Sequence, residues 1–270
     1  MVFPLFDRRP RVALLRLSGL IAARAPAPLG GATLSAAGLG PLLERAFGIR
    51  RLAAVVLVVN SPGGSPVQSS LIGNRIRALA DEKQVPVIAV AEDAAASGGY
   101  WIACAADEIV ADPASIVGSI GVISAGFGFA DAIGRIGVER RIRTAGAEKS
   151  FLDPFRAESP AERERLDEML AALHAEFTGW VKSRRGDRLK APDEALFTGR
   201  FWTGRQALAL GLVDGLGSAE GVIRDRFGEK VNILRLGQQR PPLWSRLLGG
   251  GASALLHAAE ERAAWARLGL

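Results

Sequence analysis

A run of aliphatic residues constrains the fold of this chain more than any other feature. Val55–Val59 are all β-branched or leucine, and they lead directly into Asn60–Gly64 and then into a helical pattern. A strand that is apolar at successive positions is buried on both faces, as the strands of parallel sheets are. The sequence therefore predicts a parallel sheet whose strand ends in a glycine turn. Because α/β proteins bind ligands at the carboxyl edge of the sheet, this turn marks a candidate site.

Strand and helix patterns alternate along the rest of the chain. Strands are expected at residues 12–17, 53–59, 86–91, 108–111, 121–124, 138–143 and 231–236. Helices are expected at residues 34–47, 67–82, 98–105, 129–136, 160–184, 204–210 and 219–227. This order favours an α/β domain. Between residues 108 and 122 strand patterns follow each other with little helix, which favours stacked ββα units over a simple doubly wound sheet.

Ser97 stands where a strand pattern turns into a helix pattern, with Gly98 and Gly99 behind it. A serine at such a corner can act as a nucleophile, and N–H groups at a helix start can face a developing oxyanion. The hydroxyl needs a base, and neither histidine, His174 or His257, is placed like one of a catalytic triad. Lys149, flanked by small residues, is a candidate because a desolvated lysine can accept a proton. Taken alone, each motif is ordinary, since most such turns and lysines have no catalytic role.

A third motif, Gly118–Val122, is rich in glycine and carries a second serine, Ser119. Together with Asn60–Gly64, Ala96–Trp101 and the segment Glu148–Phe155, it resembles the signal peptide peptidase A family of serine peptidases. The resemblance covers residues 11 to 236. It implies the Clp protease/crotonase-like superfold.

The resemblance implies a Ser–Lys catalytic dyad. Ser97 would be the nucleophile and Lys149 the general base, and Ser119 matches the serine that hydrogen-bonds the lysine amine in such enzymes. The expected reaction is hydrolysis of short hydrophobic peptides, such as signal-peptide remnants, by an endopeptidase. No metal, nucleotide or other cofactor is implied.

Two backbone amides match the oxyanion hole of the family, those of Gly64 and Gly98. Gly63 remains an alternative to Gly64. Short members of the family form closed rings of about eight protomers, in which the serine of one subunit meets the lysine of its neighbour. The resemblance therefore favours a homo-oligomer, although the sequence alone leaves pairing within one chain equally open.

Two other functions remain open. A crotonase-like enzyme acting on acyl-coenzyme A thioesters would use paired glycine amides in the same way. That chemistry usually employs glutamates near the oxyanion hole, and none lies beside Gly63 or Gly98. A catalytically silent scaffold that organises a membrane or protein complex is the third interpretation.

The composition excludes several classes. The net charge of +6 and a pI near 10.2 would permit contact with nucleic acid, but the arginines are scattered and no nucleic-acid motif is present. A generic basic surface is therefore the favoured interpretation. The single cysteine, Cys104, excludes an intramolecular disulfide and a cysteine-based zinc site, and its apolar helix predicts a buried structural thiol.

We expect three regions: an N-terminal tail at 1–10, a peptidase domain at 11–236, and a linker with an amphipathic helix at 237–270. That helix could dock on a neighbouring subunit, lie on a membrane surface or fray. Val12–Ala23 are apolar but broken by Arg16, and fall short of the ~20 residues that span a bilayer. The expected location is cytoplasmic, with peripheral contact to the inner membrane as an alternative. This departs from the family, whose members often carry an N-terminal anchor.

Overall fold

The computed structural model describes residues 9–23, 33–146, 148–237, 259 and 261–270. The chain divides into two compact units. The first unit contains the residues up to Gly121 and those from Phe177 onward, and the second unit is Val122–Glu176. Most of the predicted N-terminal tail, and residues 238–258 of the predicted linker and helix, lie outside the described residues.

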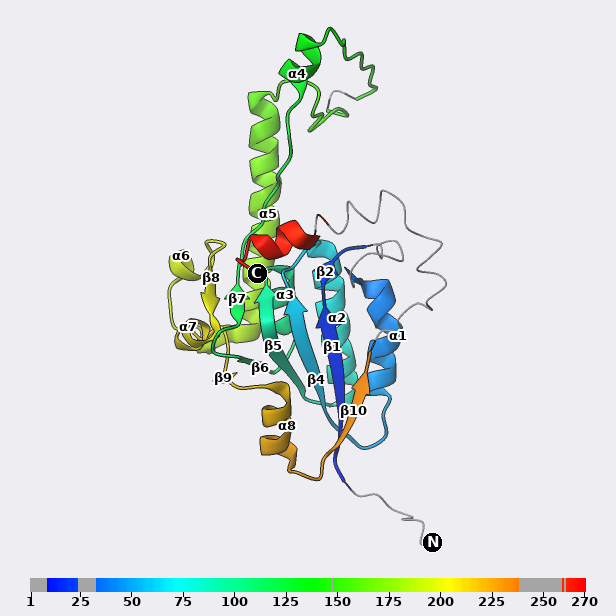
Figure 1. Ribbon diagram of the computed structural model, residues 1–270, viewed down its shortest axis with the longest axis vertical. Helices are drawn as coiled ribbons and strands as arrows, with labels where there is room; N and C mark the ends of the chain where they lie inside the picture. The colour runs from blue at the N-terminus through cyan, green and yellow to red at the C-terminus, as the bar shows by residue number, and fades with distance from the viewer. Residues whose placement is uncertain (1–8, 24–32, 147, 238–258, 260) are drawn as a thin grey trace. The chain divides into compact units, whose positions relative to one another are not determined.

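The first unit is built on a largely parallel sheet (Figure 1). Its main path runs β10 (Asn232–Leu236), β1 (Arg11–Ser18), β4 (Leu52–Ser61), β5 (Val87–Ala96), β6 (Glu108–Ala111) and β9 (Gly215–Leu216). Each neighbouring pair on this path is parallel. β7 (Ile116–Gly118) pairs in parallel with the end of β5, and β8 (Phe201–Thr203) pairs with β7 in the antiparallel sense. The short strands β2 (Leu20–Ile21) and β3 (Thr33–Leu34) form a separate pair.

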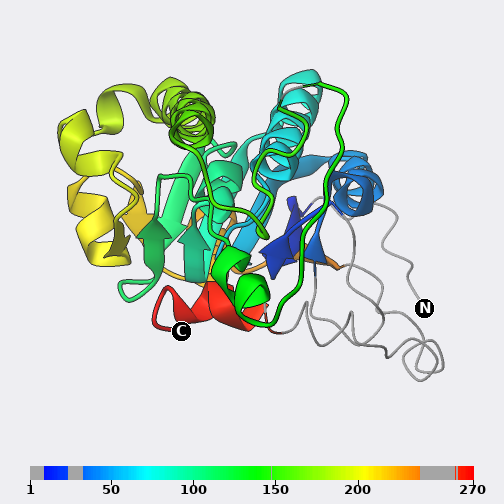
Figure 2. The same cartoon turned by 90° about the horizontal axis from the view of Figure 1, so that it is seen from above.

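Both faces of this sheet are covered, as the aliphatic run in β4 predicts. Val55, Leu57 and Val59 pack in the larger core cluster, whereas Val56 and Val58 pack in a second cluster on the other face. Helices α1 (Ala36–Phe47), α2 (Pro66–Lys83) and α3 (Gly98–Ala103) contribute to the larger cluster. The second face is covered by α8 (Ala219–Phe227) and, beside β5 and β7, by the C-terminal residues 261–270 (Figure 2).

The remaining helices of the first unit flank the edge strands. They are α6 (Asp193–Leu196), α7 (Gly204–Ala209), a 3-10 turn at Gly186–Arg188, and the last part of α5 (Pro160–Arg185). Phe177, where α5 enters the first unit, stacks on Trp101 of α3 with ring centroids 4.7 Å apart. Among the residues that the structure describes, no helix combines the length and apolar character needed to cross a bilayer.

The second unit contains α4 (Ala130–Arg135) and the first part of α5. No residue described in this unit is buried. Phe127, Phe129 and Phe155 form a loose aromatic group, with centroids 6.2 and 5.7 Å apart along the series. Apolar side chains therefore remain at the surface of this unit.

The predicted α/β class is confirmed. The predicted strands at 121–124 and 138–143 are wrong, because neither segment pairs with any described strand and both leave their apolar side chains largely in solvent. The sequence does not predict strands β2, β3, β7, β8 and β9, since two or three residues are too short to show a period.

Candidate active site

Ser97 occupies a strained corner between β5 and α3. Its φ of 51° and ψ of −121° lie in a region that non-glycine residues seldom adopt, at a cost of about 1–3 kcal/mol. The corner is held by two backbone hydrogen bonds: the Ser97 N–H donates to the Gly118 carbonyl at 2.8 Å, and the Ser97 carbonyl accepts from Trp101 N–H at 3.0 Å. The half-buried hydroxyl has no hydrogen-bond partner among the described residues. This geometry presents a serine oxygen at the start of a helix, an arrangement that can expose a nucleophile.

The glycine turn after β4 packs directly against this corner. Gly63 and Gly64 have φ values of 107° and 141°, which side-chain-bearing residues rarely adopt. A Cβ on Gly63 would lie 2.7 Å from the Ser97 Cβ, and one on Gly64 would lie 2.1 Å from the Ile21 carbonyl oxygen. Glycine is therefore required at both positions by conformation and by space.

The turn leaves one of its two amides without a partner. Gly63 N–H donates to Ser61 Oγ at 3.2 Å, whereas no hydrogen bond within the described residues uses the N–H of Gly64. The N–H of Gly98, at the first position of α3, is also unused there. A Cβ on Gly98 would lie 3.4 Å from the Gly64 nitrogen, so the two residues are neighbours. Two adjacent unpaired donors beside a serine can stabilise a developing oxyanion.

The pairing of β5 with β7 places Ser119 beside Ser97. Ala96 of β5 is paired with Gly118 of β7, so the two serines follow directly on paired residues. Ser119 also has a positive φ, 52°, and its N–H donates to the Arg200 carbonyl at 2.7 Å. The first unit therefore brings together Ser97, Ser119 and the glycine residues that the sequence selected.

Lys149 lies in the second unit, in a turn closed by a 3.3 Å hydrogen bond from its N–H to the Gly146 carbonyl. Its side chain is exposed, and its amine has no hydrogen bond or ion pair with any described residue. The neighbouring Glu148 is paired with Arg165. The Lys149 amine is therefore free to form a hydrogen bond, but no described residue shields it from solvent.

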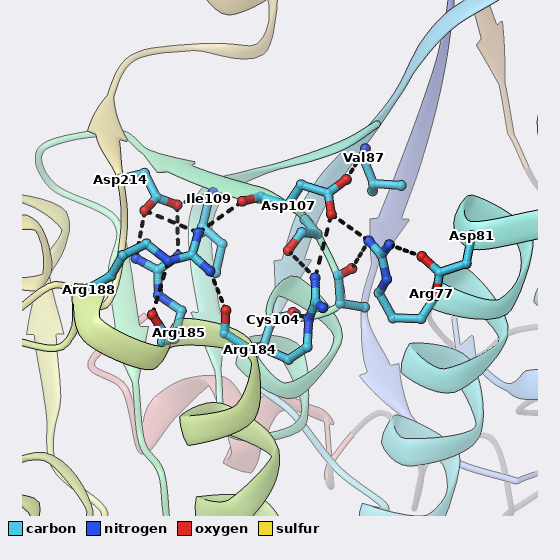
Figure 3. A network of polar contacts seen from close by, with 12 residues as sticks. Arg77, Asp81, Val87, Cys104, Asp107, Ile109, Arg184, Arg185, Arg188 and Asp214 are labelled. Atoms are coloured by element: carbon cyan, nitrogen blue, oxygen red, sulfur yellow. Dashed lines mark hydrogen bonds and ion pairs between the residues drawn. The ribbon is translucent and has the colours of Figure 1, made fainter. Parts of the chain in front are cut away.

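The end of α3 opposite Ser97 is held by side chains from α5. Trp180 Nε1 donates to the Trp101 carbonyl at 2.9 Å. Arg184 donates to the carbonyls of Cys104 and Ala106 at 3.0 and 3.1 Å (Figure 3). These carbonyls lie in the last turn of α3 or beyond it, where helical partners run out, so the two side chains serve as its C-terminal cap.

A buried ion pair fixes the same region to the sheet. Arg185 makes two hydrogen bonds to Asp214, at 2.7 and 2.9 Å, and two more to the Gly211 carbonyl (Figure 3). Asp214 also accepts from the Ile109 N–H at the start of β6 at 2.7 Å. Burial alone would raise the pKa of Asp214, but the hydrogen bonds from Arg185 and Ile109 outweigh it and hold that pKa below its usual range.

Cys104 is buried, as its apolar setting predicts, and burial raises the pKa of its thiol to about 12. It therefore stays protonated and unreactive at neutral pH. Tyr100 is fully buried, its hydroxyl donates to the Leu212 carbonyl at 2.7 Å, and burial raises its pKa as well. Within the described residues, no cluster of three or more histidine, cysteine or carboxylate side chains could hold a metal.

Ser61 lies within the glycine motif Asn60–Gly64, and the sequence alone indicates no role for it. Its hydroxyl is fully buried and contacts the turn. The available signal was a polar residue at the end of an otherwise apolar strand, where a hydroxyl has to find hydrogen bonds inside the protein.

An α/β sheet that presents a serine at a strained strand–helix corner, beside two unpaired amides, has the architecture of a hydrolase site. The chain belongs to peptidase family S49, whose sequence profile matches residues 80–231, more than half of the chain. This confirms the resemblance at the level of the family and supports the Clp protease/crotonase-like superfold.

The chain is similar to a Brucella abortus protein named Na(+)/H(+) antiporter NhaA, at 48% identity over 88% of this chain and 34% of that protein. It is 29% identical to the chloroplastic serine protease SPPA of Arabidopsis thaliana, over 92% of this chain and 37% of that one. A putative protease of Synechocystis is 32% identical over 74% and 73% of the two chains. The chain spans about a third of the length of the Brucella and Arabidopsis relatives.

Proposed function

We propose that this protein is a serine endopeptidase that cleaves short hydrophobic peptides, signal-peptide remnants among them, with Ser97 as nucleophile and Lys149 as general base. The observation that carries the proposal is the strained corner at Ser97, with the unpaired amides of Gly64 and Gly98 beside it. Family membership supports peptide substrates rather than acyl-coenzyme A thioesters. The antiporter name belongs to a protein about three times as long and gives no role to this chain.

In the proposed reaction, Ser97 Oγ attacks the scissile carbonyl carbon while its proton passes to the neutral Lys149 amine. The carbonyl oxygen becomes an oxyanion that accepts hydrogen bonds from Gly64 N–H and Gly98 N–H. The intermediate then collapses, the C–N bond breaks, and Lys149 returns the proton to the leaving amine. A water molecule, deprotonated by the same lysine, hydrolyses the acyl-enzyme and restores Ser97.

Between Gly63 and Gly64, the hydrogen bonds favour Gly64 as the first donor. Gly63 N–H is engaged by Ser61 Oγ, whereas Gly64 N–H has no acceptor among the described residues and Gly64 is exposed. Ser119 would hold the lysine amine, since it follows β7 at the position next to Ser97. An orienting hydroxyl matters here because a lysine side chain is long and flexible.

We assign the enclosure of Lys149 to a second copy of the chain. A lysine can serve as a base only where water is excluded, and this one is exposed. The second unit also leaves Phe127 and Ile136 in solvent, at 81% and 74% of their full exposure, which suits an interface between protomers. A closed ring of about eight protomers would pair the serine of one chain with the lysine of the next.

The test of the chemistry is Ser97→Ala against Ser70→Ala, a change at another half-buried serine, on α2. Peptide hydrolysis should fall at least ~10³-fold in the first and stay within about twofold in the second. Both variants should melt like the wild type, since each loses one hydroxyl. Activity that survives in folded Ser97→Ala would show that another group is the nucleophile.

Mixing tests whether the dyad forms between chains. Ser97→Ala and Lys149→Ala protomers, each inactive alone, are unfolded together and reassembled. If the dyad joins two chains, about a quarter of random interfaces unite an intact serine with an intact lysine, and activity returns in part. Mixed assemblies that form and stay inactive would place the dyad within one chain.

A further inference from the structure

Ser61 is a fully buried hydroxyl that the proposed chemistry leaves without a role. It is the last residue of β4 and lies opposite Ala95 of β5, two residues before Ser97. Its environment is the junction of the glycine turn, the end of β1 and the start of α3. A buried hydroxyl that does not meet its hydrogen-bonding capacity destabilises a protein, so its partners indicate what it does.

The hydroxyl uses its donor and one acceptor to join two turns. It donates to the Gly19 carbonyl at 2.7 Å, at the end of β1, and accepts from Gly63 N–H at 3.2 Å. On the opposite side of the turn, Ile21 N–H donates to the Gly63 carbonyl and Ser65 N–H donates to the Ile21 carbonyl, both at 2.8 Å. Ile21 thereby holds the two peptide groups that flank Gly64, and Ser61 holds the peptide group that precedes them. The N–H of Gly64 itself has no hydrogen-bond partner among the described residues.

This restraint matters because glycine has no side chain to fix its own conformation. A Gly-Gly turn loses more conformational entropy on ordering than any other dipeptide, and it samples many conformations when unrestrained. Without an acceptor at Ser61, the Gly63 N–H would be buried and unpaired, and the turn would rotate to find another partner. Rotation of that peptide would also re-aim the next one, which carries Gly64 N–H.

Ser61 also contacts α3, the helix whose first residue, Gly98, carries the second unpaired N–H. A Cβ on Gly99 would lie 2.7 Å from the Ser61 carbonyl oxygen and 3.2 Å from its Cβ, so the first turn of α3 packs directly on this residue. Gly98, which precedes Gly99, bears the other unpaired N–H. Ser61 therefore touches both the glycine turn and the first turn of α3, which carry the neighbouring N–H groups of Gly64 and Gly98.

We infer that Ser61 is a positioning residue that sets the spacing and direction of the Gly64 and Gly98 amides for the oxyanion, without touching the substrate. The inference rests on the proposed function, because it assigns those amides their role. It predicts a defect in the transition state rather than in peptide binding.

The experiment compares Ser61→Ala, Ser61→Cys and the control Ser115→Ala. Ser115 is also buried, and its hydroxyl donates to the Ala91 carbonyl at 3.2 Å, so its loss removes a comparable hydrogen bond away from the turn. Ser61→Ala should lower kcat by ~10-fold or more with KM changed less than about twofold, because misdirecting a donor costs part of what deleting it costs. Ser61→Cys, a weaker acceptor, should fall between alanine and wild type.

Affinity for a peptide aldehyde separates positioning from general loosening. The aldehyde forms a tetrahedral adduct with the serine, so its inhibition constant should rise by the same factor as kcat falls, while a non-reactive product peptide should bind equally to all variants. A kcat for Ser61→Ala equal to that of Ser115→Ala, or a loss confined to KM, overturns the inference. If Ser61→Ala fails to fold, the kcat, KM and aldehyde inhibition constant of Ser61→Cys are compared with those of Ser115→Ala instead, and the same outcomes support or overturn the inference. A wild-type protein without Ser97-dependent hydrolysis would instead refute the proposed function.

Discussion

The two units differ in how they hold the groups proposed for catalysis. In the first unit, Ser97 lies at the end of a central strand, and its strained backbone is kept in place by β7, the glycine turn and a helix whose C-terminal end is capped. In the second unit, Lys149 lies in an exposed turn, and no described residue there is buried. Half of the proposed machinery is therefore preorganised by the chain's own core, while the other half needs a covering surface before it can act.

The largest effect should come from the base itself. Lys149→Arg and Lys149→Ala should both lower hydrolysis by ~10³-fold or more, because arginine keeps the charge but cannot accept a proton. Neither should change the melting temperature, since the side chain is exposed and unpaired among the described residues. The wild-type rate should rise with pH, because only the neutral amine is a base. A rate independent of pH, or an active Lys149→Arg, would exclude a lysine base.

Loss of an ion pair should destabilise the first unit far more than the second. Arg185→Met removes a side chain only 2% exposed, and with it all the hydrogen bonds that Arg185 donates to Asp214 and the Gly211 carbonyl, so unfolding should become easier by about 3 kcal/mol. Arg165→Met removes the exposed partner of Glu148 in the second unit, which should cost at most about 1 kcal/mol. Urea unfolding of the two variants measures the contrast, and equal losses would contradict it.

The sequence predicted the first unit far better than the second. The aliphatic run before Asn60 located β4, because burial on both faces leaves a strong local signal. Ser97 was selected where a strand pattern turns into a helix pattern, and Ser119 from a glycine-rich motif. Residues 138–143 contain only two β-branched residues, Val138 and Ile142, among charged ones. They form no strand, since a strand needs a partner and none of the described strands lies there. A sequence pattern shows where apolar residues gather, but it does not show which other part of the protein packs against them.

The roles of other residues depend on tertiary contacts and could not be predicted from the sequence. Arg184, Arg185 and Asp214 act through partners far along the chain, and arginines are so frequent in this sequence that none stands out. The choice between Gly63 and Gly64 likewise needed the hydrogen bond from Gly63 to Ser61. The sequence selected the candidate residues around Ser97, and the structure was needed to find the contacts that hold them.

The depressed pKa of Asp214 makes part of the first unit's stability dependent on pH. Its folded-state pKa lies below the ordinary value of 3.8, so the carboxylate stabilises the fold above that value and loses its contribution as the pH falls through the folded-state pKa. Asp214→Asn should therefore be clearly less stable than wild type at pH 7, and the difference should shrink toward pH 3. Asp225→Asn, at an exposed position of α8, should show no such trend. A gap that is constant with pH would mean that Asp214 acts by shape alone.

The smallest effect on folding should come from the apolar surface of the second unit. Phe127→Ser combined with Ile136→Ser removes two side chains that are largely in solvent, so the free energy of unfolding of the protomer should change by no more than about 0.5 kcal/mol. If that surface is covered by a second copy, the double variant should sediment as smaller species and lose hydrolysis together with assembly. Arg141→Ser, whose side chain is 82% exposed, keeps the apolar groups and should remain assembled and active. A double variant that assembles and cleaves peptides like the wild type would show that Lys149 is enclosed by some other surface, and would leave the serine half of the site as the only part explained by the protein's own packing.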